Sequence, residues 1–483
     1  MKKKLLCFGL AVLLSMASAF AQSGEAGPLT WTLSKGTLTI SGEGEMPDYE
    51  WGGKEVPWYP YRESINTVVM EPGVTTIGNY AFFYCWRITS LTIPNSVTTI
   101  GDGAFYYCGG LTSIAIPNSV TTIGDRALSG CSNLKSLTIP NSVTTIGVEA
   151  FRGCHNLTSI TLSNNLKCIE KGTFYACGGL KSITIPGSVT SIGEEAFQWC
   201  TGLTSATLSE GVTHIGNCAF EYSGLVSISL PNSLTAIGIV AFGFCKSLTS
   251  IIIPDGVTNI EYAAFAYCES LTSVTLPNNL KAIKNQAFEY CPNLTSIVIP
   301  DKVESIGNKS FSHCANLTTL TLPNSLKTIG DNAFFACKNL TLITNLNPVP
   351  IDIYPVIFYG VDKAACTLEV PIGSVAAYQN ADVWKEFNIV GIEVGIEEWR
   401  IENGELRIYP NPTDGLLRIE NGKLKMENVD IYDVLGRKQK IIFNFHPELN
   451  SGSTFNLTHL PSGIYFIRIH TETGTVVRKV IKR

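Results

Sequence analysis

The chain has 483 residues, of which 45% are hydrophobic and 16% are charged, and its formal net charge is −5. This apolar content excludes disorder for most of the chain, and the charge gives no basic surface for nucleic acid. The 43 Gly and 23 Pro interrupt long helices, so the composition favours a folded, β-rich or turn-rich protein.

The first 21 residues have the features of a secretory signal peptide. Lys2 to Lys4 are basic, the stretch from Leu5 to Phe20 is largely apolar, and Ala19-Phe20-Ala21 supplies small residues for cleavage. A short membrane anchor is the alternative, but the apolar stretch is too short to span a bilayer comfortably. We therefore expect a signal peptide at residues 1–21 and an exported mature chain with no transmembrane segment.

Residues 22–68 come next and are rich in aromatic side chains, among them Trp31, Trp51 and Trp58. Residues 36–42 predict a strand between turns. We interpret this segment as an N-terminal cap for the repeats that follow, because an uncovered apolar end of a repeat stack would aggregate.

Residues 69–341 contain one unit of 23 residues, written twelve times with the consensus L-x-x-I-x-I-P-x-x-V-x-x-I-G-x-x-A-F-x-x-C-x-x. An Ile slot is filled without exception from Ile77 to Ile329, and the Phe slot is broken only by Leu128. A one-residue deletion follows Ser223, which stands in the Cys slot. Eleven of the 15 Cys fill that slot and form a structural ladder: Cys85, Cys108, Cys131, Cys154, Cys177, Cys200, Cys245, Cys268, Cys291, Cys314 and Cys337.

Each unit predicts one coil of a solenoid. Leu91-Thr92-Ile93 alternates inward and outward like a short half-buried strand, and Pro94 ends the strand because it has no amide to donate. Ala104, Phe105 and Cys108 have the spacing of one short helical or 3-10 turn. A single unit cannot bury its apolar edge alone, so the units are expected to stack.

The repeat resembles the 23-residue leucine-rich repeats of the BspA-like family, which are found on the surfaces of bacteria and some protozoa. The resemblance implies a mostly β solenoid: a right-handed leucine-rich-repeat stack of about 12 units with short helical or 3-10 turns. It also implies adhesion or recognition, with extracellular protein or glycan ligands on the matrix or on other cells as partners.

Residues 342–395 predict a degenerate repeat and a C-terminal cap, in which Tyr378, Trp384 and Phe387 seal the end of the stack. Residues 396–403 are the expected linker. In residues 404–483, short alternating runs such as Leu416–Ile419 and Ile464–Ile469 predict a small β-sandwich.

The sandwich is also similar to the type A sorting domain of the type IX secretion system. Three motifs carry the resemblance, together with a basic C-terminus, and their residues are Tyr409, Pro410, Asn411, Pro412, Gly436, Arg437, Gly463, Lys479 and Lys482. The resemblance implies the type IX secretion machinery as a partner and a secreted or cell-surface, outer-membrane-associated protein. An ordinary adhesion sandwich is the alternative.

Motifs that carry catalysis or metal binding are missing from the sequence. No two of the six His have a metal-binding spacing, and there is no H-E-x-x-H, G-x-S-x-G, P-loop or EF-hand motif. The sequence therefore predicts no catalytic, metal or cofactor site, and a protein that is not an enzyme.

The Cys ladder has two interpretations. Export permits disulfides, and equivalent Cys of neighbouring coils would lie about 5 Å apart, within bonding range. However, side chains in equivalent slots point in parallel, and Ser223 interrupts the column. A free Cys also packs as a small hydrophobe, so we favour a buried, unpaired ladder.

Two surface columns are the candidate binding face. The slot before the Cys holds an aromatic column, Tyr84, Tyr107, Trp199, Tyr222, Phe244, Tyr267 and Tyr290. The outward strand position holds a threonine ladder that includes Thr92, Thr138, Thr161 and Thr184. Aromatic rings suit protein or sugar partners, but they also protect an edge by stacking, and the threonines also fit simple strand propensity.

The sequence therefore favours a secreted or cell-surface leucine-rich repeat protein that mediates adhesion to, or recognition of, host or bacterial surface macromolecules through many weak contacts. The alternative is a glycan-binding or structural surface-layer component without a protein receptor.

Overall fold

The computed structural model describes residues 21–392 and, beyond them, 407–409, 416–420, 426–433, 438–439, 442–444, 453–457, 460, 463–471 and 474–482. Residues 1–20 of the predicted signal peptide and the predicted linker at 396–403 lie outside these ranges. The chain divides into two compact units, one up to Ile392 and one from Glu393. Within the described ranges, no helix combines the length and the apolar composition that crossing a membrane requires.

The first unit begins with a small antiparallel sheet that turns into the solenoid. Strand β3 pairs antiparallel with β2 on one side and parallel with β5 on the other, so the cap and the stack share one sheet. The elements here are β1 (Gln22–Ala26), β2 (Leu29–Ser34), β3 (Thr37–Gly42), β4 (Gly44–Glu45) and the 3-10 helix η1 (Tyr59–Tyr61).

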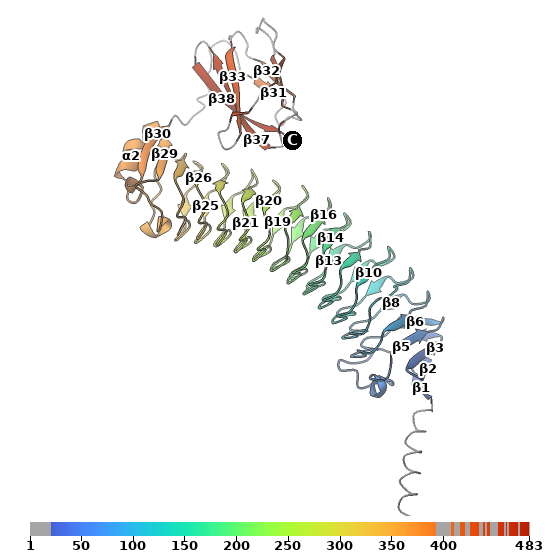
Figure 1. Cartoon of the computed structure of the whole chain (residues 1–483). Helices are drawn as coiled ribbons and strands as arrows, with labels where there is room; N and C mark the ends of the chain where they lie inside the picture. The colour runs from blue at the N-terminus through green and yellow to red at the C-terminus, as the bar shows by residue number, and fades with distance from the viewer. Residues whose placement is uncertain are drawn as a thin grey trace, which may run out of the picture. The chain divides into compact units, whose positions relative to one another are not determined.

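The repeats form the coils of the stack, which follow one another in chain order (Figure 1). Each coil, apart from the one at residues 111–117, contributes a three- or four-residue strand to one parallel face, with equivalent residues in register, such as Leu137 beside Ile160. The strands of this face are β5 (Thr67–Met70), β7 (Ser90–Thr92), β10 (Ser136–Thr138), β12 (Ser159–Thr161), β14 (Ser182–Ile185), β16 (Ser205–Leu208), β18 (Ser227–Ser229), β20 (Ser250–Ile252), β22 (Ser273–Thr275), β24 (Ser296–Val298), β26 (Thr319–Leu322) and β28 (Leu342–Asn345).

A second, narrower parallel face is built from the V-x-x-I step of each repeat. Its strands are two residues long after β6, and each buries the invariant Ile. They are β6 (Val74–Ile77), β8 (Thr99–Ile100), β9 (Thr122–Ile123), β11 (Thr145–Ile146), β13 (Cys168–Ile169), β15 (Ser191–Ile192), β17 (His214–Ile215), β19 (Ala236–Ile237), β21 (Asn259–Ile260), β23 (Ala282–Ile283), β25 (Ser305–Ile306) and β27 (Thr328–Ile329).

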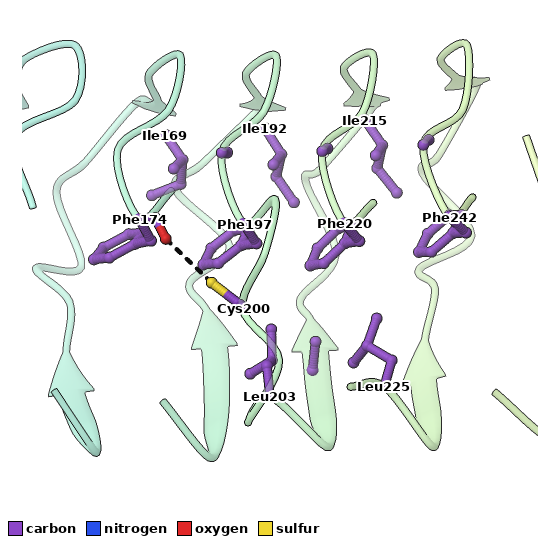
Figure 2. Packing of buried hydrophobic residues seen from close by; sticks show 14 of the residues in the cluster. Ile169, Phe174, Ile192, Phe197, Cys200, Leu203, Ile215, Phe220, Leu225 and Phe242 are labelled. Carbon is purple, nitrogen blue, oxygen red and sulfur yellow. Dashed lines mark hydrogen bonds between the residues drawn. The ribbon is translucent and has the colours of Figure 1, made fainter. Parts of the chain in front are cut away.

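A column of buried Phe rings runs through the centre of the stack. From Phe151 to Phe358 the rings of successive coils stack with centroids 5.1–5.5 Å apart, as Figure 2 shows for Phe174 to Phe242. Leu128 interrupts the column after Phe105. One slot of the repeat therefore supplies most of the aromatic core.

Aromatic residues of the two caps close this column. Trp58 stacks on Phe82 with the ring centroids 5.7 Å apart and donates its indole N–H to the carbonyl of Ala81. At the other end, Trp384 and Phe387 contact Phe358 edge-on. The cap elements there are η2 (Pro355–Phe358), β29 (Thr367–Pro371), η3 (Ile372–Ser374), α2 (Val375–Asn380), η4 (Trp384–Glu386) and β30 (Asn388–Ile392). Trp384 and Phe387, which the sequence predicts as sealing residues, thus contact the last ring of the column, and Tyr378 packs edge-on against Trp384 behind them.

The third side of each coil consists of turns. Ala104, Phe105 and Cys108 were expected on one short helical or 3-10 turn, but within the described repeats regular 3-10 and α-helices lie only in the caps. The amides of Ala104, Phe83 and Cys85 bond to the carbonyl three residues earlier, whereas those of alternate residues, such as Phe82, bond to the next coil. Repeated hydrogen bonds between coils therefore hold the backbone of this side in a conformation that a single isolated turn would not adopt.

Two residues of every repeat on this side have left-handed backbones. One precedes the Ala of the A-F pair, as Tyr80 does with φ of 54°, and the other precedes the Cys slot, as Tyr84 does with φ of 58°. L-residues other than Gly and Asn rarely adopt this conformation, at a cost of roughly 1–2 kcal/mol. Hydrogen bonds to the neighbouring coil therefore compensate a local backbone strain in each repeat.

Val240 offers a test of this strain, because a β-branched residue there has φ of 55°. Replacing it by Asn, which Asn332 shows in the same slot, is expected to raise the free energy of unfolding by about 1 kcal/mol. Val148→Asn is the matched control, since Val148 lies in the preceding slot without a positive φ. Equal effects of the two substitutions in chemical denaturation would contradict the strain.

The described residues of the second unit form two antiparallel four-stranded sheets, with strand orders β31-β32-β36-β35 and β34-β33-β37-β38. The predicted strand runs at residues 416–419, 429–432 and 464–469 fall in β32, β33 and β37. The strands are β31 (Arg407–Tyr409), β32 (Leu416–Glu420), β33 (Met426–Asp433), β34 (Lys438–Gln439), β35 (Ile442–Asn444), β36 (Ser453–Asn456), β37 (Gly463–Thr471) and β38 (Gly474–Lys482).

Candidate functional site

The predicted aromatic column lies at the surface of the turn side. Each member has the second left-handed backbone of its repeat, and its amide donates to the next coil, as Trp199 does to Glu221 over 2.9 Å. Because hydrogen bonds to the adjacent coils fix this backbone, every ring leaves its coil in the same direction. The repeat thus places one outward-facing ring per coil wherever the slot holds an aromatic residue.

The rings stack on one another in two runs. Tyr84 and Tyr107 form the short run, with ring centroids 4.9 Å apart. The long run contains Trp199, Tyr222, Phe244, Tyr267, Tyr290 and His313, with successive centroids 4.1–4.8 Å apart and ring planes within 13° of parallel. Trp199 is 43% exposed and Tyr290 37% exposed. The rings therefore stack and still present a continuous edge to solvent.

His313 belongs to this column although sequence reasoning did not include it. It directly precedes Cys314 and stacks on Tyr290 with centroids 4.1 Å apart. Its position one residue before the ladder Cys was the signal that could have found it. An imidazole ring stacks in the same way as the ring of Phe, Tyr or Trp, so this slot also accepts His.

The predicted threonine ladder also lies at the surface. Thr92, Thr138, Thr161 and Thr184 are all exposed, and Thr138 is paired in register with Thr161. In the same slot farther along, Ile252 is 71% exposed and Val298 57% exposed. The hydroxyl-rich face is therefore interrupted by exposed aliphatic side chains in the C-terminal half of the stack.

Other threonines that the sequence places nearby have a structural role. Immediately before the strands, the hydroxyl of Thr158 donates to the carbonyl of Lys135 over 2.9 Å, and Thr272 donates to Thr249 in the same way. The second face repeats this bond, for example from Thr213 to Thr190. These hydroxyls donate to carbonyl groups of the neighbouring coil. The threonines of the outward strand position are therefore the better placed to contact a ligand.

The ladder Cys lie in the core and donate hydrogen bonds. Cys200 Sγ donates to the carbonyl of Phe174 over 3.1 Å (Figure 2), and the same bond recurs from Cys108 to Cys337 at each coil whose slot holds Cys. Burial raises the pKa of Cys200 and Cys154 to about 12. A thiol this hard to ionise does not act as a nucleophile near neutral pH.

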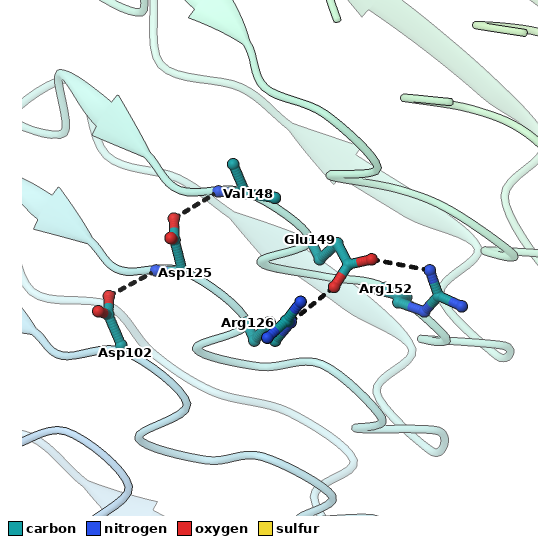
Figure 3. A network of polar contacts seen from close by, with 6 residues as sticks. All are labelled: Asp102, Asp125, Arg126, Val148, Glu149 and Arg152. Carbon is teal, nitrogen blue, oxygen red and sulfur yellow. Dashed lines mark hydrogen bonds and ion pairs between the residues drawn. The ribbon is translucent and has the colours of Figure 1, made fainter. Parts of the chain in front are cut away.

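A polar ladder runs along the turn side as well. A carboxylate oxygen of Asp102 accepts from the amide of Asp125, and Asp125 accepts in turn from Val148, over 2.8 and 2.7 Å (Figure 3). Asn side chains take the same role farther along, as Asn308 does for Asp331. This ladder was not predicted, because its carboxylates look like solvated charges in the sequence.

Glu149 joins two arginines beside this ladder. Its carboxylate accepts from Arg126 over 2.6 Å and from Arg152 over 2.8 Å (Figure 3). Partial burial opposes ionisation of Glu149, but the hydrogen bond from Arg126 and the charges of both arginines outweigh it and lower the pKa of Glu149. The guanidinium of Arg152 also lies 4.0 Å from the ring centroid of Tyr175.

No group of three or more His, Cys, Asp or Glu that could hold a metal ion occurs in the part of the chain that the structure describes. Of the predicted sorting residues, Tyr409 ends β31, Gly463 begins β37, and Lys479 and Lys482 lie in β38. The others, Pro410, Asn411, Pro412, Gly436 and Arg437, lie outside the described residues.

Two family models match the chain. The one described as BspA type Leucine rich repeat region matches in six copies at residues 59–177, 130–248 and 235–363. The one described as Secretion system C-terminal sorting domain matches residues 407–483. Neither describes a catalytic domain. The sorting-domain match indicates export through the type IX secretion machinery to the cell surface or the medium.

Solved structures of leucine-rich repeat proteins are also similar. One from Bacteroides ovatus is 28% identical with a TM-score of 0.53, over 71% of this chain and 98% of that one. A leucine rich cell surface protein from Faecalibacterium prausnitzii is 26% identical with a TM-score of 0.43, over 67% and 94% of the two chains. One from Eubacterium ventriosum is 28% identical with a TM-score of 0.45, over 66% and 95%. No curated protein matches.

Proposed function

Because the chain belongs to the BspA-type leucine-rich repeat family, we propose that it is a non-enzymatic adhesion protein that binds extracellular proteins of the matrix or of other cells. The proposal concerns the exported chain, and its binding elements are the repeats. We further propose that residues 1–21 direct export, that 22–68 and 342–395 cap the repeats at 69–341, and that 404–483 form the sorting domain after a linker at 396–403.

The observation that carries this proposal is the long aromatic run. Six stacked rings from Trp199 to His313 form one partly exposed edge. Their backbones are fixed by hydrogen bonds to adjacent coils, so binding loses little conformational freedom. Rigid aromatic side chains supply much of the energy of protein interfaces. Repetition along the stack adds contacts without a deep pocket.

The test compares binding of the full chain and a ladder variant to a panel of immobilised extracellular-matrix proteins. In the ladder variant, Tyr222, Phe244 and Tyr267 are replaced by Ala, which Ala176 and Ala336 show in the same left-handed slot. We expect saturable binding by the parent chain and at least about tenfold weaker binding by the variant, because the central rings of an interface carry most of its energy.

The matched control changes the other candidate surface. Replacing Thr138, Thr161 and Thr184 by Glu changes three exposed side chains on the strand face. This variant is expected to bind as the parent chain does. No saturable binding by the parent chain would contradict adhesion, and loss of binding only in the strand-face variant would move the site to the threonine ladder.

The exposed threonine face supports a second candidate function, a glycan-binding or structural surface-layer component with no protein receptor. A flat, uncharged, hydroxyl-bearing surface suits polysaccharide chains. A glycan array probed with the same two variants separates the candidates, because this function requires a glycan signal that the strand-face variant loses.

Export is tested by truncation. Removing residues 404–483 deletes the segment that contains the sorting-domain match and is expected to leave the protein in the periplasm. Surface display is measured by protease accessibility on intact cells, with a substitution of Tyr222 as a control that keeps the tail. Normal display of the truncated chain would refute the sorting role.

A further inference from the structure

The aromatic column has a gap between its two runs. In three successive coils, the slot before the Cys holds Gly130, Gly153 and Ala176 instead of a ring, although its backbone keeps positive φ values of 76°, 71° and 56°. From Tyr107 to Trp199 is four coil steps, or about 19 Å at about 4.8 Å per step. The coil geometry therefore continues through the gap while the rings are missing.

A pocket of about 450 Å³ lies in this gap, on the side of Tyr107. Its lining includes Tyr107, Gly130, Arg152, Gly153 and His155. The volume falls within the range of about 300–1,000 Å³ that is usual for small-ligand sites. A Cβ added at Gly153 would have no heavy atom closer than 3.9 Å. The pocket therefore has free space directly next to this residue.

The Tyr107 ring forms one wall of the pocket. One face of the Tyr107 ring stacks on Tyr84, and the ring extends over Gly130, where a Cβ would lie 2.9 Å from Tyr107 Cγ. The next ring of the column, Trp199, is about 19 Å away, too far to cover the other side of a single bound ring. A ligand here therefore has one face on the Tyr107 ring, and its other sides lie among glycine backbone and the side chains of Arg152, His155 and Tyr175.

His155 supplies a hydrogen-bond acceptor. Its Nδ1 lies 3.0 Å from the carbonyl oxygen of Ala176, and because a carbonyl only accepts, Nδ1 is the donor in this bond. The neutral imidazole then has an unprotonated Nε2. This atom lies 3.9 Å from the position of a Cβ at Gly153, at the open part of the pocket.

Arg152 supplies hydrogen-bond donors. One guanidinium nitrogen donates to Glu149, whose carboxylate also binds Arg126, and the guanidinium lies over the ring of Tyr175. A guanidinium has five N–H donors in a fixed plane, so others remain beyond the bond to Glu149. Arg152 is 40% exposed at its side chain.

From this arrangement we infer that the gap at Gly130 and Gly153 is a binding site for a neutral pyranose residue of a glycan. A pyranose ring has an apolar C–H face for the exposed Tyr107 ring and hydroxyl groups that both donate to His155 Nε2 and accept from Arg152. An aromatic side chain of a protein would leave those polar groups unpaired, whereas sugar hydroxyl groups satisfy both of them. The site gives the proposed surface role a sugar ligand, but it does not require the long aromatic run to bind protein.

The test measures binding of the full chain to a panel of neutral oligosaccharides (cellotriose, maltotriose, chitotriose and mannotriose) by isothermal titration calorimetry. Saturable binding to at least one of them is expected. Gly153→Tyr places in the gap the ring that Tyr84 and Tyr107 show in the same slot at φ of 58° and 57°, so it fills the pocket within a conformation that the repeat accepts. It should weaken binding more than tenfold.

Two further variants assign the contacts. Tyr107→Ala removes the wall and should weaken binding about tenfold, a loss of roughly 1.4 kcal/mol, whereas Tyr290→Ala removes a ring of similar exposure from the long run and should not change it. Unchanged melting temperatures of Gly153→Tyr and Tyr290→Ala report intact folding. The ladder variant that tests protein binding keeps every pocket residue, so failure of the adhesion proposal and failure of the sugar site give different results.

Any of three results would overturn the sugar site: no saturable binding to the neutral panel, equal binding by Gly153→Tyr and the parent chain, or binding of N-acetyltyrosine amide in the pocket without binding of any sugar.

Discussion

Raising the pH from 8 to about 10 under reducing conditions is expected to unfold the repeat stack. The cause is the column of eleven buried thiols. Burial raises the pKa of several of them, such as Cys85, Cys245 and Cys314, to about 12, and that of others, such as Cys177, well above the ordinary value of 9.0. In the unfolded chain these thiols ionise near their ordinary pKa.

The sign follows from proton binding. A group with a pKa raised by folding keeps its proton in the native state after the unfolded chain has lost it, so stability is full below the unfolded pKa and falls as pH rises above it. Between pH 8 and 10 each thiol costs about 1.4 kcal/mol, and eleven cost about 15 kcal/mol. Typical domains are stable by only about 5–15 kcal/mol.

The measurement is urea unfolding followed by circular dichroism at several pH values from 8 to 10.5, with a reductant present. The slope of stability against pH gives the number of protons released on unfolding. Replacing both Cys200 and Cys245 by Ala should reduce this number by two near pH 10, whatever its effect on stability at pH 8. A slope of only one or two protons in the parent chain would contradict buried, protonated thiols.

The same ladder predicts the thiol content of the exported protein. A count on denatured, unreduced chain should find at least about ten free thiols, because each ladder Cys from Cys108 to Cys337 donates to a backbone carbonyl rather than bonding to sulfur. A lower count would restore the disulfide interpretation that export leaves open.

Replacing Phe197 by Ala is expected to destabilise the stack by about 3–5 kcal/mol. Phe197 is fully buried and stacks on Phe174 and Phe220, with centroids 5.2 and 5.1 Å away. Truncation leaves a cavity in a column whose walls are held by the coils on either side. The loss is measured as the change in the free energy of unfolding at neutral pH.

Phe197→Leu is the matched control and is expected to cost about 1 kcal/mol. Leu128 occupies the Phe slot in this chain and is fully buried, so a coil of this type accepts the smaller side chain. Similar losses for Ala and Leu would show that ring stacking, rather than filled volume, determines the effect.

The sequence predicted the buried slots well, because each carries an unambiguous residue. Ile100, Phe105 and Cys108 recur with a fixed period and fill the core as expected. The sorting resemblance in residues 407–483 is likewise matched. In the repeat slots, one residue type recurs in nearly every coil, so its position identifies the core.

The turn side could not be predicted in the same way. Its first left-handed slot holds residues as different as Arg126, Glu149 and Val240, and only contacts between coils impose the conformation. The sequence shows Gly130 and Gly153, but these residues indicate a pocket only once the structure shows that the slot otherwise carries a stacked ring. The ladder of Asp102 and Asp125 was missed because its side chains accept from the amide of the next coil, a contact that the sequence does not show.

The one-residue deletion after Ser223 has a further consequence. Although this coil has one residue fewer, the strands on both sides remain in register, with Ser205 paired to Ser227 and Ile215 to Ile237. The segment between the Cys slot and the strand therefore absorbs changes in length that the rest of the coil cannot. The register of the stack therefore does not depend on an exact unit length of 23 residues, and a change of one residue in this segment leaves the pairing of both faces intact.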